Sequence, residues 1–261
     1  MIKQLKEYLD FANKFSEVSG NILKKKFNKS FDIETKNDGS LVTEADKEIE
    51  SLFRDSLMKK YPSHGILGEE FGEYNINSSH LWVIDPLDGT HNFIAGKPLF
   101  GTLICLIINN VPSMGIIDIP VLGERWTGVK GNGVHKNNKL CCFDKKKKKL
   151  KDAILASTSL LMFNQKETKV IKRIYEKIRF PVFGTDCYAY GLLLSGKIDL
   201  IIESKMKPWD YMAQVSLIKE FGGIISDWSG KELTPKSSGD VIASYSEECY
   251  QEAIKYLAKI K

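Results

Sequence analysis

The sequence predicts a layered fold of α-helices and β-strands in a globular chain. Apolar residues recur at helical spacing near both ends and through the second half, whereas short apolar runs typical of strands fill the middle. Hairpin-like strands together with separated helices favour layered α/β structure. The chain has 261 residues, of which 43% are hydrophobic and 27% charged, so it can bury a substantial core.

Two helices with a short strand between them are predicted at the N-terminal end. Apolar residues from 2 to 22 recur every three or four positions, and the pattern fades about one turn later. Residues 27–41 predict a short strand and loop, with Asn37-Asp38-Gly39 as the turn. A second helix is expected from about Thr43, because Thr43 followed by Asp46 is typical of a capping arrangement.

The remaining elements show neither an internal repeat nor a linker rich in Gly, Ser or Pro. Strands are predicted at 65–67, 81–84, 103–108, 113–119, 124–129, 153–156, 198–203 and 223–227. Helices are predicted at 167–178, 188–195, 212–221 and 246–260. We therefore expect one domain of residues 1–261, with an N-terminal α+β half of about 1–150 and a C-terminal α/β half of about 151–261.

Composition disfavours several classes of protein. No apolar run approaches the ~20 residues that span a bilayer, and the charged N-terminus is unlike a secretory signal, which favours the cytoplasm. Much of the net charge of +5 comes from the run Lys145–Lys149, which is typical of a solvated loop. The five cysteines are odd in number and lack zinc-binding spacing. We expect neither a membrane partner nor nucleic acid, because no aromatic-interleaved motif accompanies the lysines.

Two aspartates follow a short apolar strand in the middle of the chain. Asp85 and Asp88 bracket Pro86, which we expect to end the strand so that both carboxylates emerge at its edge. Gly89 then allows a tight turn, and Thr90 can open a short helix whose backbone N–H groups favour a phosphate. Carboxylates beside a phosphate site suit Mg2+. The alternative is an ordinary loop, since Asp-Pro and Asp-Gly are common turn pairs.

Three further segments with acidic residues strengthen the metal interpretation. Gly68-Glu69-Glu70 follows a strand-like segment shortly before Asp85, although adjacent acids there are often only surface charge. Asp210 lies at the start of a helix expected from about Tyr211, where an aspartate is most often an N-cap. Asp46 on the second helix is the third position.

These motifs, in this order, resemble the inositol monophosphatase family. The segments that carry the resemblance are Leu41–Asp46, Gly68–Glu70, Trp82–Phe93 and Trp209-Asp210. The stretch Asp-Pro-Leu-Asp-Gly-Thr-x-Asn-Phe is a specific motif, and the resemblance covers nearly the whole chain. It implies a five-layer α/β/α/β/α sandwich, usually a homodimer, that hydrolyses a small phosphate monoester with two or three Mg2+ ions.

The resemblance also implies a role for each matching residue. The implied metal ligands are Glu69, Asp85, Asp88, Asp210 and the carbonyl of Leu87. Substrate contacts are implied for Asp88, Gly89, Thr90, Asp186, Glu203 and Asp210, with Gly89 and Thr90 binding phosphate through their amides. Thr90 and Asp46 would orient the attacking water, and Glu70 would assist. The resulting hypothesis is in-line attack of metal-activated water without a phosphoenzyme.

Several stretches look most like the histidinol-phosphatase branch of the family. They are 93–98 with 100–104, 117–120 running into 122–126, and 184–190. Histidinol phosphate carries an amine and an imidazole, which would suit acids such as Asp186 and Glu203. His91-Asn92 and Trp209 look more like inositol-type enzymes, so inositol monophosphate is the alternative substrate. Bisphosphate substrates and a scaffold without turnover are weaker alternatives.

Overall fold

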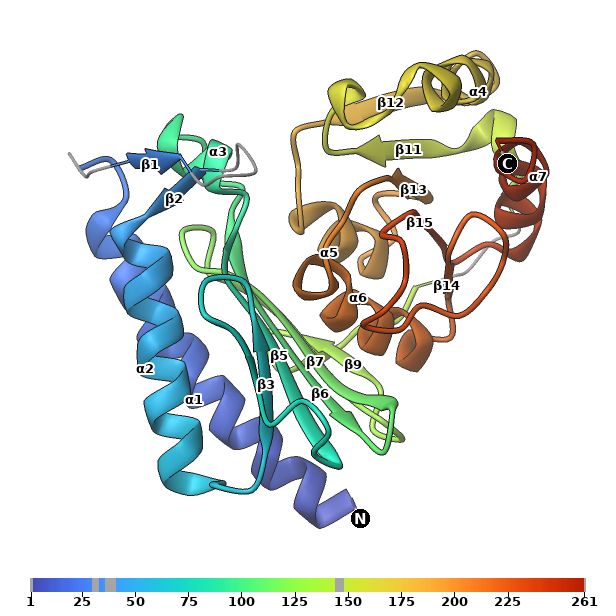
Figure 1. Ribbon diagram of the computed structural model, residues 1–261. Coiled ribbons are helices and arrows are strands. Elements are labelled where there is room, and N and C mark those ends of the chain that lie inside the picture. The colour runs from blue at the N-terminus through green and yellow to red at the C-terminus, as the bar shows by residue number, and fades with distance from the viewer. Residues whose placement is uncertain (1, 30–32, 36–40, 144–147, 261) are drawn as a thin grey trace.

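Five layers of helices and sheets make up the protein (Figure 1). The computed structural model describes residues 2–29, 33–35, 41–143 and 148–260. From the first layer to the last they are α1 (Ile2–Lys26) with α2 (Glu44–Lys60), an eight-stranded sheet, α5 (Tyr188–Leu194) with α6 (Pro208–Phe221), a five-stranded sheet, and α4 (Gln165–Tyr175) with α7 (Glu247–Leu257). The expected α/β/α/β/α sandwich is confirmed.

The eight-stranded sheet holds the strands from the middle of the chain, in the order β10-β9-β8-β7-β6-β5-β3-β4. The strands are β3 (Gly65–Gly68), β4 (Gly72–Tyr74), β5 (His80–Asp88), β6 (Gly101–Ile108), β7 (Val111–Ile119), β8 (Glu124–Val129), β9 (Val134–Lys136) and β10 (Lys139–Leu140). Neighbours pair antiparallel except β3 and β5, which are parallel. The short helix α3 (Thr90–Ile94) follows β5 directly.

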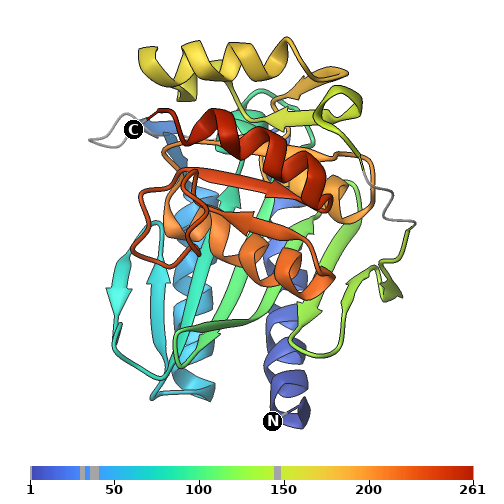
Figure 2. The ribbon, with the colours of Figure 1, turned by 90° about the vertical axis from the view of Figure 1, so that its right-hand side faces the viewer.

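The five-stranded sheet has the order β12-β11-β13-β15-β14, and Figure 2 shows α7 across its outer face. Its strands are β11 (Ile154–Ser157), β12 (Phe180–Phe183), β13 (Leu200–Glu203), β14 (Ile224–Ser226) and β15 (Val241–Ser244). Short 3-10 helices occupy Leu150–Asp152 and Leu160–Met162. A separate pair, β1 (Ile33–Thr35) and β2 (Leu41–Thr43), lies near α3 (Figure 1).

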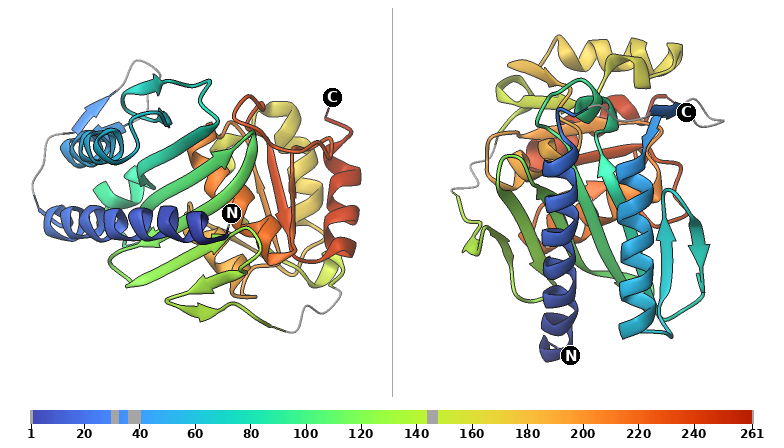
Figure 3. Two further views of the ribbon diagram at one scale, coloured as in Figure 1. Left: turned by 90° about the horizontal axis from the view of Figure 1, so that it is seen from below. Right: turned by 90° about the vertical axis from the view of Figure 1, so that its left-hand side faces the viewer.

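Apolar side chains fill each space between layers. Helices α1 and α2 lie side by side over the first sheet (Figure 3), and their Phe11 and Phe53 contact its Trp82. Helix α6 is apolar almost all round, with Tyr211 to Ile218 buried, because sheets cover it on both sides. This is why helical periodicity in the sequence marks α6 only weakly.

Most predicted elements are confirmed, with shifted ends. Thr43 caps α2, with its side chain and that of Asp46 completing a capping box as expected. The prediction missed the short strands β4, β9 and β10. It also missed β12, whose strand contains a proline, and β15, whose four buried residues follow a Ser/Gly-rich stretch. The predicted turn at Asn37-Asp38-Gly39 and residues 145–147 of the lysine run lie outside the described residues. No helix in the described ranges has the length and apolarity to cross a membrane.

Candidate functional site

An acidic cavity of about 300 Å3 lies where the end of β5 faces β13, α5 and the start of α6. Nine of the residues singled out in the sequence line it: Glu69, Asp85, Leu87, Asp88, Gly89, Thr90, Asp186, Glu203 and Asp210. Asp46 and Glu70 are not among the lining residues. The fold therefore brings together segments that are more than half the chain apart.

Three carboxylates converge in this cavity. Asp85, Asp88 and Asp210 each place one carboxylate oxygen within 4.8 Å of the others. Glu69 joins them because β3 and β5 are parallel neighbours, with Gly68 opposite Ile84, so both strands end at the same edge. The sequence predicted this convergence.

The segment Asp85–Asp88 differs from the expectation that Pro86 ends the strand. Strand β5 continues to Asp88, and its pairing with β6 shifts register between Asp85 and Asp88. Within this irregular stretch the Leu87 N–H donates to Asp85 Oδ1 at 2.9 Å, and Thr90 Oγ1 donates to the Leu87 carbonyl at 3.0 Å. The prediction was wrong because a bulged strand tolerates proline where no ladder bond is needed. Both aspartates consequently remain anchored to the sheet.

Asp210 also lies differently from the prediction. Helix α6 begins at Pro208, so Asp210 is its third residue, and it accepts a hydrogen bond of 2.7 Å from the backbone N–H of Lys207. Proline is favoured in the first turn of a helix, which explains the earlier start. The carboxylate thus completes the cap and enters the acidic cluster at the same time.

One contact in the cluster was not predicted. The backbone N–H of Cys187, just before α5, donates to Asp88 Oδ2 at 2.7 Å. Backbone donors carry no sequence signature, so only the three-dimensional arrangement reveals it. This bond ties the start of α5 to the acidic cluster.

The cluster is electrostatically unfavourable without a cation. Burial raises the pKa of Asp85, Asp88 and Asp210, and the neighbouring carboxylates raise each pKa further. Together with Glu69 and the Leu87 carbonyl they offer only oxygen donors, the set that hard divalent cations prefer. The residues present therefore fit one or more metal ions.

Asp46 lies behind the cluster. Its Oδ2 accepts hydrogen bonds from the Thr43 N–H and hydroxyl at 2.8 and 2.6 Å. Its Oδ1 is buried and has no hydrogen-bond partner in the described part of the chain. Burial raises the pKa of Asp46 to about 6, and Glu69 raises it too. A buried carboxylate oxygen without a protein partner, beside acidic residues, can bind a water molecule or a cation.

Glu70 has a backbone role that the sequence did not predict. Its N–H donates to Glu50 Oε2 at 2.6 Å, and Glu50 is fully buried on α2. Arg54 pairs with the same carboxylate at 2.8 Å. Glu50 therefore fixes the turn that carries Glu69 and Glu70.

Two further acids line the cavity beyond the cluster. Glu203 accepts hydrogen bonds from the Tyr190 hydroxyl at 2.8 Å and from the Thr158 hydroxyl at 2.5 Å. Asp186 accepts one from Asn92 and has a positive φ of 44°. Burial raises the pKa of Asp186 to about 8, and the charges of Asp88 and Glu203 contribute. A cationic group bound at this end of the cavity would favour the ionised form of Asp186, as Lys97 does in part.

Comparison with known proteins gives matches along the whole chain. The model of the inositol monophosphatase family matches residues 4–261. The bifunctional phosphatase IMPL2, chloroplastic, of Arabidopsis thaliana is 38% identical, over 97% of this chain and 76% of the relative. The histidinol-phosphatase of Chlorobaculum parvum is 30% identical, over 90% of this chain and 92% of that protein. The structure of an inositol monophosphatase from Zymomonas mobilis superimposes with a TM-score of 0.87 at 34% identity, covering 97% and 98% of the two chains.

Proposed function

Because the chain belongs to the inositol monophosphatase family, we propose that its acidic cavity hydrolyses a small phosphate monoester with the help of Mg2+. The observation that carries the proposal is the convergence of Asp85, Asp88 and Asp210 beside Gly89 and Thr90. Carboxylates can bind the divalent cations that neutralise a phosphate group. The adjoining turn supplies backbone N–H groups that can donate hydrogen bonds to the phosphate oxygens.

Metal ions would be held by Glu69, Asp85, Asp88, Asp210 and the Leu87 carbonyl. Two or three ions are proposed, because so many buried carboxylates need more than one divalent cation to offset their charge. When bound, such cations activate water and neutralise charge on the transferring phosphoryl group. Asp85 interacts electrostatically with Glu69, Asp88 and Asp210, so we expect it to be the least replaceable ligand.

Thr90 and Asp46 would orient the attacking water. The Thr90 hydroxyl proton is directed to the Leu87 carbonyl, which leaves the lone pairs of Oγ1 to accept a hydrogen bond from water. Asp46 carries one unsatisfied oxygen close to the cluster, and Glu70 would assist from the adjacent turn. Gly89 and Thr90 would bind the phosphate through their amides, aligning phosphorus for in-line attack without a phosphoenzyme.

L-Histidinol phosphate is the substrate that we propose first. Asp186 and Glu203 place two carboxyl groups at the end of the cavity away from the phosphate turn. A protonated amine and an imidazole would favour the ionised forms of these acids and add to the compensation that Lys97 gives Asp186, whereas an uncharged polyol would add none. Inositol monophosphate is the second candidate, because the hydrogen-bonded Glu203 can also accept from a hydroxyl.

A phosphate-release assay tests the proposal. L-Histidinol phosphate and myo-inositol 1-phosphate are compared with and without Mg2+, alongside Asp85→Asn as the inactive control. We expect Mg2+-dependent release from histidinol phosphate at a kcat/KM at least about tenfold above that for the inositol ester. Similar low rates on both would reject the preferred substrate, and no release from any ester would favour a scaffold. Light scattering would test the proposed homodimer.

A further inference from the structure

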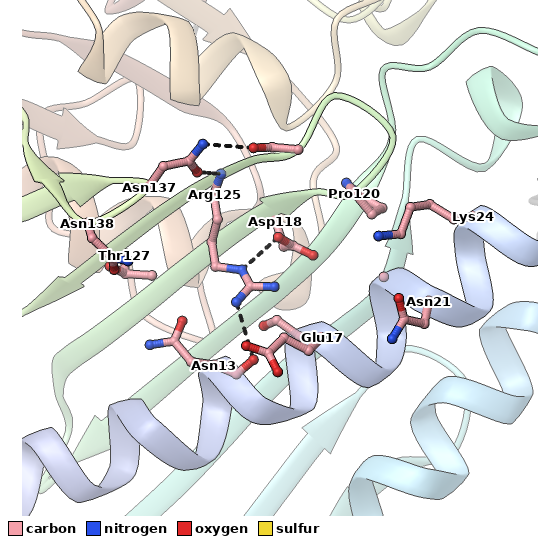
Figure 4. A pocket seen from close by; sticks show the side chains of 13 residues that line it. Asn13, Glu17, Asn21, Lys24, Asp118, Pro120, Arg125, Thr127, Asn137 and Asn138 are labelled. Atoms are coloured by element: carbon pink, nitrogen blue, oxygen red, sulfur yellow. Dashed lines mark hydrogen bonds and ion pairs between the residues drawn. The ribbon is translucent and has the colours of Figure 1, made fainter.

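A second polar cavity, of about 570 Å3, lies between α1 and the hairpin of β7 and β8 (Figure 4). It shares no residue with the acidic cavity. Glu17, Asn21 and Lys24 line it from α1, and Asp118, Arg125 and Asn138 line it from the sheet side. Its size is ample for a small metabolite.

A fixed ion pair forms the floor of this second cavity. Asp118 is 4% exposed and accepts a hydrogen bond of 2.7 Å from Arg125 Nε. Arg125 also donates to the Asn13 carbonyl at 3.3 Å, which joins the hairpin to α1 (Figure 4). The floor is therefore preorganised, and its two charges compensate each other.

Two opposite charges above the floor are available to a ligand. Glu17 and Lys24 are exposed, and neither forms an ion pair with another residue of the described ranges. They lie two turns apart on α1, about 10 Å along the helix axis. A simple anion would be repelled by Glu17 and a simple cation by Lys24, so their combination favours a zwitterion. Asn21 and Asn138 add amides that can hydrogen-bond either end.

A hydrogen-bonded path connects α1 to the segment Asp85–Asp88. Ser19 Oγ lies 2.5 Å from Thr102 Oγ1, and Thr102 Oγ1 lies 2.9 Å from the Pro86 carbonyl. Because a carbonyl only accepts, Thr102 must donate to Pro86, and Ser19 therefore donates to Thr102. Both hydroxyl side chains are fully buried, so the path is shielded from water.

The second cavity contacts the same path. Thr102 is the register partner of Asp118 on β7. A Cβ atom at Gly20, next to Ser19, would lie 3.3 Å from Asp118 Oδ2 and 3.1 Å from Pro120 Cβ. Helix α1 and the cavity floor are thus in tight contact, so a displacement of either is transmitted to the other.

We infer that this second cavity is an effector site for a small zwitterion bearing an ammonium and a carboxylate, of the free amino acid class. Glu17 binds the ammonium, Lys24 binds the carboxylate, and occupancy reaches the segment Asp85–Asp88 through Ser19 and Thr102. The binding part of this inference is independent of the proposed function, whereas the coupling part rests on the proposed metal-binding role of that segment.

Calorimetry on the full chain without Mg2+ or substrate tests binding. The probes are the free L-amino acids, with acetate and methylamine as carriers of one charge each. We expect at least one amino acid to bind, and Glu17→Gln and Lys24→Met each to weaken it about tenfold or more. Lys25→Met, an exposed neighbour outside the cavity, is the matched control and should bind normally. Failure of every amino acid to bind, or wild-type affinity in both cavity variants, would overturn the site.

Coupling is tested by the Mg2+ affinity of the full chain, measured with and without the amino acid that binds. We expect a change of about fivefold or more, equal in size to the change that Mg2+ causes in amino acid affinity. Ser19→Ala should retain amino acid binding but lose this mutual effect. Unchanged Mg2+ affinity in the wild type would reject the coupling. Loss of activity towards every ester, with the mutual effect intact, would count against the proposed function alone.

Discussion

The buried carboxylate of Glu50 accepts a hydrogen bond of 2.6 Å from the backbone N–H of Glu70, which places helix α2 in direct contact with the turn of the acidic cluster. The same carboxylate accepts from the Phe71 N–H at 3.1 Å and pairs with Arg54. A side chain at Gly68 would collide with it, so the glycine and the glutamate require each other. Glu50 is a positioning residue for the Glu69 turn.

Replacing this glutamate should weaken metal binding. In Glu50→Gln the amide retains the shape but loses the charge that faces Arg54, so we expect a loss of about 1–3 kcal/mol in unfolding free energy. Mg2+ affinity should fall by about 10–100-fold, as for other residues that orient metal ligands. Denaturant unfolding and calorimetry measure the two effects. Glu48→Gln, an exposed substitution on the same helix, is the control; equal Mg2+ affinity in both variants would contradict the positioning role.

Asp85→Asn should separate activity from stability. We expect phosphate release to fall about 100-fold or more, because a carboxylate that interacts with every other acid of the cluster is lost. Without Mg2+ the same variant should melt at a higher temperature than the wild type, since burial and neighbouring acids raise the pKa of Asp85 and its charge is unfavourable. Thermal unfolding with EDTA checks this, and Asp55→Asn, which replaces an exposed aspartate on α2, is the control. A lower melting temperature for Asp85→Asn under these conditions would refute the electrostatic explanation.

His64 should make the protein less stable in mild acid. Its Nδ1 accepts a hydrogen bond of 3.0 Å from Trp82 Nε1, and burial lowers the pKa of His64 to about 4. The unfolded chain, with a histidine pKa of about 6.5, therefore binds more protons between these values. The stabilisation is complete above pH ~6.5 and is lost as the pH falls towards 4, at up to about 1.4 kcal/mol per unit. Urea unfolding at several pH values measures this slope, which should flatten in His64→Gln.

Asp186→Asn should affect a cationic substrate selectively. We expect KM for histidinol phosphate to rise about tenfold, because a charged hydrogen bond to the amine or imidazole becomes a neutral one. Hydrolysis of inositol monophosphate, which carries no cation, should change much less. Steady-state kinetics on both esters gives the comparison. A parallel loss on both would instead indicate that Asp186 supports the cavity through its bond to Asn92.

The sequence predicted which carboxylates gather in the cavity better than it predicted the groups that hydrogen-bond to them. Asp85, Asp88, Glu69 and Asp210 could be found because a metal site requires particular side chains in recognisable motifs. The Cys187 N–H that binds Asp88 could not, since any residue provides a backbone donor.

The predicted ends of helices and strands were wrong where tertiary packing overrode a local sequence preference. Pro86 normally ends a strand, but a bulge lets β5 continue past it. Asp210 resembled an N-cap, yet Pro208 starts α6 earlier. Glu50 was overlooked because a glutamate on a helix is usually exposed, and its partners come from a turn 20 residues away.

Because β5 continues through Asp88, one side of the acidic cavity is built from the first sheet. Asp85, Asp88 and the turn after them belong to the first sheet, whereas Asp186, Glu203 and Asp210 come from the opposite half of the chain. With the roles proposed above, substitutions at Asp186 and Glu203 would change the alcohol that is released, while Asp210 and the carboxylates of the first sheet would still hold the metal ions. One ancestral hydrolase could in this way give rise to enzymes for dissimilar metabolites without rebuilding its reaction centre.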